Sequence, residues 1–277
     1  MHSFYFHGLP GSAGELALFG ERLARCGARM RVVPRNEIAA APGDGDLFDA
    51  MARWVDDASG GEPVELVGFS LGGAAALRVA ARLEARVSRL QLISAAAPLD
   101  LGDYLQDMAG AAVFRAAAHS QARLSRIARW QALAARIAPQ LMVRALLASA
   151  RGEDRLLRRD ARFTAVLAEM VQDCLVPPAD SYLREIALYA QPWRDELLGV
   201  KARVDLWHGT HDNWSPPQMA ADLAAALPDC QPVRWLEGCS HYSTLAAWLD
   251  RRSNTGAPAA ASRAAGRSSF NSTETST

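Results

Sequence analysis

Short runs of β-branched and aromatic residues alternate along this chain with longer stretches of helical periodicity, and this alternation restricts the fold more than any other feature. It predicts β-α-β units, in which helical crossovers connect parallel strands. The expected strands span residues 3–6, 29–33, 63–67, 88–94, 202–208 and 232–236. The expected helices span residues 13–26, 46–58, 71–84, 217–227 and 242–251. The sequence therefore predicts an α/β fold with a mostly parallel sheet of about six strands flanked by helices.

One long segment interrupts the alternation. Residues 100–195 contain no convincing strand and are rich in Ala, Leu and Arg. An all-helical insertion between two parallel strands would lie above the carboxyl ends of the strands. We therefore expect residues 100–195 to form a helical lid on a core made of residues 1–99 and 196–252. Residues 253–277 are mostly Ser, Thr, Ala, Gly and Arg, a composition that cannot offset the entropy of ordering, and we expect a disordered tail there.

Arginines recur through the insertion at mostly helical intervals, and they have two interpretations. They are Arg115, Arg123, Arg126, Arg129, Arg136 and Arg144. The spacing favours a solvated helix face, and the alternative is a binding surface for an anionic substrate or partner. Large apolar residues of the same segment, namely Met108, Phe114, Trp130 and Met142, could line an acyl pocket, although burial within the insertion is the favoured interpretation.

Composition excludes several classes of protein. The 277 residues carry a formal net charge of zero, so bulk charge does not favour nucleic acid or an anionic membrane as a partner. No uninterrupted apolar run is long enough to span a membrane, and the first residues lack the pattern of a signal peptide. The four cysteines are scattered without metal-ligand spacing and are expected to be free thiols. These features predict a cytoplasmic protein.

The segment Gly68-Phe69-Ser70-Leu71-Gly72 carries the strongest chemical signal. An apolar run precedes it and an alanine-rich helical stretch follows it, as a nucleophile elbow requires. Glycines two residues before and after the serine leave room for the strand and the helix to approach each other. The alternative is a serine that only caps a helix, a role that does not call for both glycines. Ser70 is therefore the candidate nucleophile.

A serine nucleophile needs a base, and the base needs an orienting group. His241 follows the last expected strand, and Asp212 follows the preceding one, so both should lie at the same edge of the sheet as Ser70. Asp100 is a second candidate for the acid, less favoured than Asp212. His208 and His211 beside Asp212 could suggest a metal site, but a short loop with no further ligand is poor support for one. We expect no metal and no cofactor.

Negative charge that develops on a substrate oxygen requires preorganised donors. One is expected from the backbone N–H of Leu71, directly after the nucleophile. The other should come from the loop His7-Gly8-Leu9-Pro10-Gly11-Ser12. Since Pro10 has no N–H, Leu9 is the expected donor, although the loop could also be an ordinary glycine-proline turn.

Taken together, these motifs resemble the lidded serine hydrolases of the α/β-hydrolase superfamily. The resemblance covers residues 3–251 and rests on the oxyanion loop, the serine elbow, the Gly209-x-x-Asp212 segment and the late Ser240-His241 pair. It implies a Ser70, Asp212 and His241 triad, with Leu9 and Leu71 as the oxyanion hole. The family usually has two further strands before the oxyanion loop, which here begins at His7. The resemblance therefore implies a sheet without these strands and without their antiparallel edge.

The resemblance implies hydrolysis of a carboxylic ester, or a related acyl bond, of a small molecule. A second possibility keeps the fold and uses the serine and histidine to make or break C–C bonds, as in the lyase of menaquinone synthesis. A third is a non-catalytic scaffold that only binds a ligand. Substrate identity, lid movement and oligomeric state are not determined by these patterns, and no nucleic acid partner or membrane span is expected.

Overall fold

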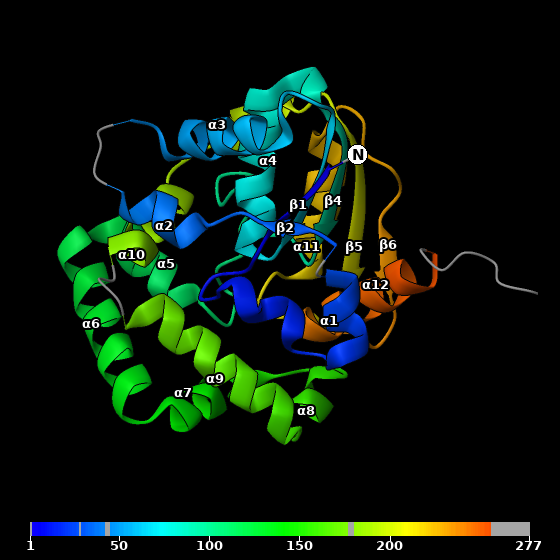
Figure 1. Ribbon diagram of the computed structural model, residues 1–277. Helices are drawn as coiled ribbons and strands as arrows, with labels where there is room; N and C mark the ends of the chain where they lie inside the picture. The colour runs from blue at the N-terminus through cyan, green and yellow to red at the C-terminus, as the bar shows by residue number, and fades with distance from the viewer. Residues whose placement is uncertain (1, 28, 42–44, 177–179, 256–277) are drawn as a thin grey trace, which may run out of the picture.

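Six strands form one sheet in this computed structural model, which describes residues 2–27, 29–41, 45–176 and 180–255. The strands are β1 (His2–Phe6), β2 (Arg31–Val32), β3 (Val64–Phe69), β4 (Val87–Ile93), β5 (Arg203–Gly209) and β6 (Arg234–Leu236). Their order across the sheet is β2-β1-β3-β4-β5-β6, and each neighbouring pair is parallel (Figure 1). The predicted α/β fold with a parallel sheet of six strands is confirmed.

Helices cover both faces of the sheet. The core helices are η1 (Ala13–Ala17), α1 (Glu21–Gly27), α2 (Arg35–Ala40), α3 (Leu47–Ser59), α4 (Leu71–Leu83), η2 (Glu84–Arg86), η4 (Arg194–Gly199), α11 (Pro217–Ala226) and α12 (His241–Thr255). The expected single helix over residues 13–26 is two short ones, because Gly20 between them has a left-handed φ of 88°. In the described residues no helix combines the length and apolar character needed to cross a membrane.

Two hydrophobic cores follow from the alternation of side chains along the strands. On one face, Phe4 and Phe6 of β1 are buried in the same cluster as residues of α3, α4 and α11. On the other face, Tyr5 is buried in a cluster with residues of α1 and α12. The sheet is thus the middle of three layers, and its strand ends are left to form a site (Figure 1).

Between β4 and β5 the described residues form helices and no strand. Before η4, these helices are α5 (Ala111–His119), α6 (Gln121–Ile137), α7 (Pro139–Leu146), η3 (Leu147–Ser149), α8 (Asp154–Leu157), α9 (Ala161–Leu175) and α10 (Asp180–Tyr189). We call α5 to α10 the helical insertion. It lies beyond the carboxyl ends of the strands, at the lower left of Figure 1. Of the tail expected over residues 253–277, the first three residues end α12, and residues 256–277 lie outside the described residues.

A buried ion pair joins the insertion to the core. Arg35, at the start of α2, donates from Nε and Nη2 to Glu185 of α10, with Nε 3.1 Å from Glu185 Oε2. Its Nη1 donates to the carbonyl of His7, the residue directly after β1. Both charged side chains are almost fully buried. A buried pair of this kind fixes how two elements meet, because neither charge can be left without its partner.

Replacing one member of this ion pair should lower the free energy of unfolding far more than replacing both members. We expect Arg35→Met to lower the free energy of unfolding by about 3–5 kcal/mol, because Glu185 then keeps an uncompensated buried charge. The double variant Arg35→Met/Glu185→Leu should recover most of that loss. Urea unfolding followed by circular dichroism measures both, and a double variant no more stable than the single one would contradict the assignment.

Candidate active site

Ser70 occupies a strained turn between β3 and α4. Its φ of 56° and ψ of −128° lie in a region that residues other than glycine rarely adopt. The turn requires glycines around it: a Cβ on Gly72 would lie 2.1 Å from the carbonyl oxygen of Phe6, and one on Gly73 would lie 2.5 Å from Ala95 Cβ. The chain can therefore turn sharply here only with these glycines, and the serine is presented at the carboxyl end of the sheet.

Asp212 and His241 lie in hydrogen-bonding contact at the same sheet edge. His241 Nδ1 is 2.8 Å from Asp212 Oδ2. The other carboxylate oxygen accepts the backbone N–H groups of Trp214 and Ser215 at 2.9 and 3.0 Å. Both side chains are buried, so the loop after β5 holds the carboxylate in one orientation toward the imidazole.

Asp100, the less favoured acid, has a different role in this structure. It accepts the backbone N–H groups of Trp193 and Arg194, at 3.2 and 3.4 Å, where the chain returns from the insertion to the core. Asp100 thus caps the start of η4 and makes no contact with His241 among the hydrogen bonds of the described residues.

The pKa values of the pair are shifted in the directions that favour an ion pair. Burial alone would raise the pKa of Asp212, but the charge of His241 and its hydrogen bond lower it below the ordinary value. Burial alone would lower the pKa of His241, but Asp212 raises it above 6.5. The contact therefore makes the imidazole a stronger base than a free histidine.

Ser70 and His241 line one small cavity, together with Trp214 and the ring of Phe69. The His241 ring packs against Phe69 at a centroid distance of 4.7 Å and stacks near Trp214 at 6.0 Å. These aromatic contacts restrict the ring to a position beside the serine turn. The three residues singled out in the sequence, Ser70, Asp212 and His241, are thus brought together.

Asp154, in α8 of the insertion, supports the helix that begins at His241. Its carboxylate accepts the backbone N–H of Tyr242 at 3.0 Å, and the backbone N–H and hydroxyl of Ser243 at 2.8 and 2.6 Å. It is an N-terminal cap supplied from almost ninety positions earlier in the chain. No local sequence signal identifies it, because a cap is normally the residue just before the helix.

Close backbone packing fixes the position of Asp154. Gly152, with a left-handed φ of 49°, leaves no space for a side chain, because a Cβ there would lie 2.2 Å from the carbonyl oxygen of Gly238. The next residue, Glu153, donates its N–H to that same carbonyl at 3.0 Å. The insertion is therefore attached directly to the loop that carries His241.

The loop after β1 brings Leu9 to the other side of the serine. Leu9 and Leu71 both line a second cavity beside Ser70, which we call the main cavity of the site. Neither N–H finds a hydrogen-bond partner within the described part of the chain. The adjacent N–H of Gly8 is already engaged, since it donates to Glu15 Oε1 and Oε2 at 3.1 and 2.9 Å. Two unengaged donors thus lie beside the serine.

Glu15 is a residue that the sequence analysis missed. Besides Gly8, it accepts the hydroxyl of Tyr5 at 2.6 Å. Burial raises its pKa to about 7. The signal was the spacing Ser12-x-x-Glu15, typical of a capping box. Ser12 does cap η1, but the glutamate extends to Gly8 and so braces the loop that carries Leu9.

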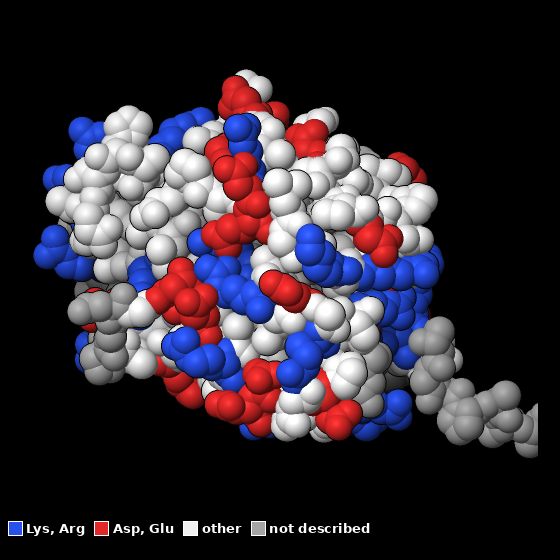
Figure 2. Space-filling view, turned by 90° about the horizontal axis from the view of Figure 1, so that it is seen from above, with Lys and Arg blue, Asp and Glu red and all other residues white. Residues whose placement is uncertain are grey.

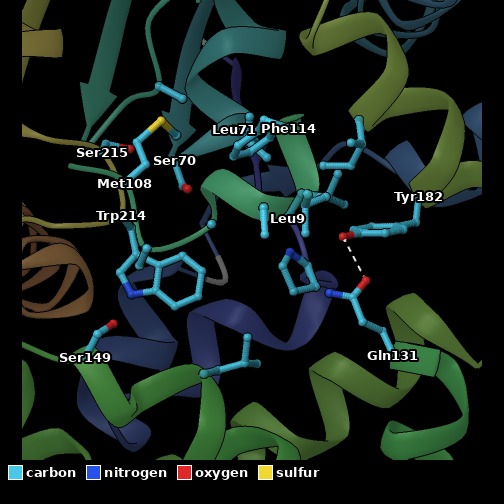
Figure 3. Close-up of a pocket in the computed structure, with 18 of the residues that line it drawn as sticks. Leu9, Ser70, Leu71, Met108, Phe114, Gln131, Ser149, Tyr182, Trp214 and Ser215 are labelled. Carbon is cyan, nitrogen blue, oxygen red and sulfur yellow. Dashed lines mark hydrogen bonds between the residues drawn. The ribbon is translucent and has the colours of Figure 1, made fainter. Parts of the chain in front are cut away.

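The main cavity has a volume of about 340 Å³ and a mostly apolar lining. Figure 3 shows the Ser70 hydroxyl pointing into it, with Trp214 on one side and Tyr182 and Gln131 opposite. The Tyr182 hydroxyl donates to Gln131 Oε1 at 3.2 Å. Of the four large apolar residues considered from the sequence, Met108, Phe114 and Met142 line the cavity, whereas Trp130 is 68% exposed at the surface.

The three side chains of the loop after β5 that could suggest a metal site, His208, His211 and Asp212, all make hydrogen bonds within the protein. His208 Nε2 donates to the carbonyl of Ser215 at 2.8 Å, and burial lowers the pKa of His208 below its ordinary value. His211 Nδ1 lies 3.1 Å from its neighbour's hydroxyl, on Thr210. Throughout the described residues, no group of three or more His, Cys, Asp or Glu side chains could hold a metal ion.

Comparison with known proteins identifies the architecture. Residues 4–245 match the family model described as the alpha/beta hydrolase fold. Comparison with curated proteins gives no match. Among solved structures, the chain is similar to an enol-lactonase from Burkholderia xenovorans, with 19% identity, a TM-score of 0.55 and coverage of 91% of this chain and 88% of that one.

Two esterases give similar values. A thermophilic esterase from Thermogutta terrifontis is 18% identical with a TM-score of 0.59, over 91% of this chain and 90% of that one. An esterase from a Rhodococcus species is 18% identical with a TM-score of 0.58, over 90% of each chain. At this identity the likeness establishes the fold.

The buried Glu15 should make stability depend on pH in a recognisable way. In the unfolded chain the Glu15 carboxyl group loses its proton near pH 4.5, whereas in the folded protein it keeps that proton until about pH 7. The folded state binds more protons in this window, so its free energy of unfolding falls as pH rises, by about 3 kcal/mol from this group. The glutamine of Glu15→Gln does not titrate, so this decrease in the free energy of unfolding is absent from the variant. The free energy of unfolding of Glu15→Gln minus that of the wild type should therefore rise between pH 4.5 and 7.

Urea unfolding across this pH range measures the difference. Glu62→Gln is the matched control, because Glu62 is an exposed carboxylate on the opposite end of the sheet, before β3. Stability curves of Glu15→Gln and the wild type that run parallel over the whole range would contradict the assignment.

Proposed function

The chain belongs to the α/β-hydrolase family of enzymes, and we propose that it hydrolyses a carboxylic ester of a small molecule with Ser70 as nucleophile. Asp212 and His241 complete the proposed triad, and the N–H groups of Leu9 and Leu71 form the proposed oxyanion hole. The observation that carries the proposal is the 2.8 Å contact between His241 and Asp212, next to a serine in a strained turn that lines the same cavity.

In the first half of the proposed reaction, His241 Nε2 takes the proton of the Ser70 hydroxyl as its oxygen attacks the ester carbonyl. Asp212 keeps the N–H of the imidazole on Nδ1 and stabilises the imidazolium that forms. The carbonyl oxygen becomes negatively charged and accepts the N–H groups of Leu9 and Leu71. His241 then gives its proton to the departing alcohol, which leaves an acyl group on Ser70.

In the second half, water replaces the alcohol. His241 takes a proton from the water while the water oxygen attacks the acyl carbonyl. It gives this proton to the Ser70 oxygen when the carboxylic acid leaves. The enzyme ends in its starting state, and no step uses a metal or cofactor. The strained turn at Ser70 supports this role, because it keeps the hydroxyl clear of its own backbone.

The lining of the main cavity supports an apolar acyl or alcohol group as the substrate's larger part. Phe114, Met108 and Met142 surround the space beyond Ser70, and a volume of about 340 Å³ suits a small molecule. Tyr182 and Gln131 add one polar position opposite the serine. The structural neighbours named as esterases and as an enol-lactonase are consistent with ester chemistry on this fold.

Aryl esters of graded acyl length test the proposal. The wild type should hydrolyse at least one of them, and Ser70→Ala should lower kcat/KM by at least about a thousandfold, because the nucleophile is lost. Ser120→Ala is the matched control, since Ser120 lies between α5 and α6 and does not line the cavity. Hydrolysis that survives in Ser70→Ala, or no turnover of any ester by the folded wild type, would contradict the proposal.

A further inference from the structure

The helical insertion contains a long segment without any acidic residue. Between residues 108 and 152 there is no Asp or Glu, while seven arginines occur: Arg115, Arg123, Arg126, Arg129, Arg136, Arg144 and Arg151. The whole chain is formally neutral, so this positive charge is balanced elsewhere in the sequence. Bulk composition therefore conceals a strongly basic region.

The arginines of α6 and α7 are exposed to solvent, and no acidic partner for them lies among the described residues. Arg126, Arg129, Arg136 and Arg144 are exposed, and none of them takes part in an ion pair within the part of the chain that the structure describes. Figure 2, which looks down on the molecule, shows separate basic side chains among uncharged ones along its left edge and a larger basic group at its right edge. Most acidic side chains lie nearer the middle of that view.

Large apolar side chains lie on the same surface. Trp130 is 68% exposed, Ile137 72%, Leu141 65% and Leu133 44%. In α6, Trp130, Leu133 and Ile137 recur at intervals of three and four, so they lie on one face of the helix, and Arg126 is one turn before Trp130 on that face. The buried residues of α6, such as Leu124 and Ala128, lie on the opposite side. Three large apolar side chains exposed in a row on one helix face are unusual unless something covers them.

This surface is the outer wall of the cavity that contains Ser70. Gln131 of α6, and Met142 and Ala145 of α7, line the cavity. Gln131 projects from a different side of α6 than Leu133 and Ile137, whereas Ala145 is one turn after Leu141 on the same side of α7. A partner bound to this exposed face would thus contact the same helices that line the cavity of the proposed nucleophile.

We propose that the face formed by Arg126, Arg129, Trp130, Arg136, Ile137 and Leu141 binds the surface of an anionic lipid membrane. Arginine guanidinium groups pair with lipid phosphates, and each is worth roughly fivefold in affinity near an anionic surface. Tryptophan and aliphatic side chains enter the boundary between headgroups and acyl chains. The helices would lie along the membrane surface and would not cross it.

The combination of charges and apolar groups favours lipid over other partners. A second copy of this chain, packed face to face, would bring arginines against arginines with no carboxylate on the face to compensate. Nucleic acid would satisfy the arginines but would leave Ile137 and Leu141 exposed to its charged backbone. A lipid surface satisfies both sets of side chains at once.

Sedimentation with vesicles tests this without reference to catalysis. The wild type should bind vesicles of phosphatidylcholine mixed with phosphatidylglycerol at low ionic strength, and should bind much less to phosphatidylcholine alone or at high salt. Arg126→Gln/Arg129→Gln/Arg136→Gln should lower the affinity on the order of a hundredfold. Trp130→Ser/Ile137→Ser should lower it by about tenfold.

Exposed residues elsewhere supply the matched controls. Arg25→Gln/Arg53→Gln/Arg203→Gln removes the same charge from α1, α3 and β5, and Leu198→Ser removes an exposed apolar side chain from η4. Both controls should bind like the wild type, and circular dichroism checks that every variant is folded.

Three results would overturn the proposal. One is no binding to the anionic vesicles, or equal binding to neutral ones. Another is wild-type binding by the triple arginine variant of the face. The third is a dimer, detected by light scattering, that Trp130→Ser/Ile137→Ser converts to a monomer, since the face would then be a contact between two copies of the chain. Ester hydrolysis is not measured here, so the outcome is independent of the proposed reaction.

Discussion

The contact between His241 and Asp212 is the interaction on which the site depends. The two residues come from loops that follow different strands, and the parallel order of β5 beside β6 is what brings those loops together. The carboxylate is held by two backbone N–H groups, and the imidazole by Phe69 and Trp214. An imidazole fixed in this way has an N–H toward the carboxylate and a basic nitrogen free for the serine.

The helical insertion contacts the core at three places around this pair. Asp154 caps the helix that His241 begins, Gly152 packs against the backbone of Gly238, and Glu185 pairs with Arg35 beneath the loop that carries Leu9. The insertion therefore contacts the helix that begins at the proposed base and, through Arg35, the loop that carries the proposed oxyanion donor. We propose above that its outer face binds a membrane, and an apolar substrate would be concentrated at that membrane. The membrane surface would then lie against the helices that line the main cavity.

Much of the fold and site could be predicted from local patterns. The six strands, the elbow at Ser70 and the positions of Asp212 and His241 after successive strands all follow from short-range signals, because parallel strands end at one edge. Glu15 and Asp154 could not be predicted in their actual roles, since each bonds to backbone that only folding brings near. Trp130 was considered for the pocket but lies on the surface, because helical spacing does not determine which face of α6 meets the core.

The rate at which a fluorophosphonate labels the protein, followed by peptide mapping and measured against pH, tests the central claim without knowledge of the substrate. We predict one label, on Ser70, at a rate that rises with pH through an ionisation above 6.5, the ordinary pKa of histidine. In Asp212→Asn the labelling should be much slower, and the ionisation should move to lower pH, since burial then acts on His241 without the carboxylate. A label elsewhere, or equal rates and pH profiles in the two proteins, would contradict it.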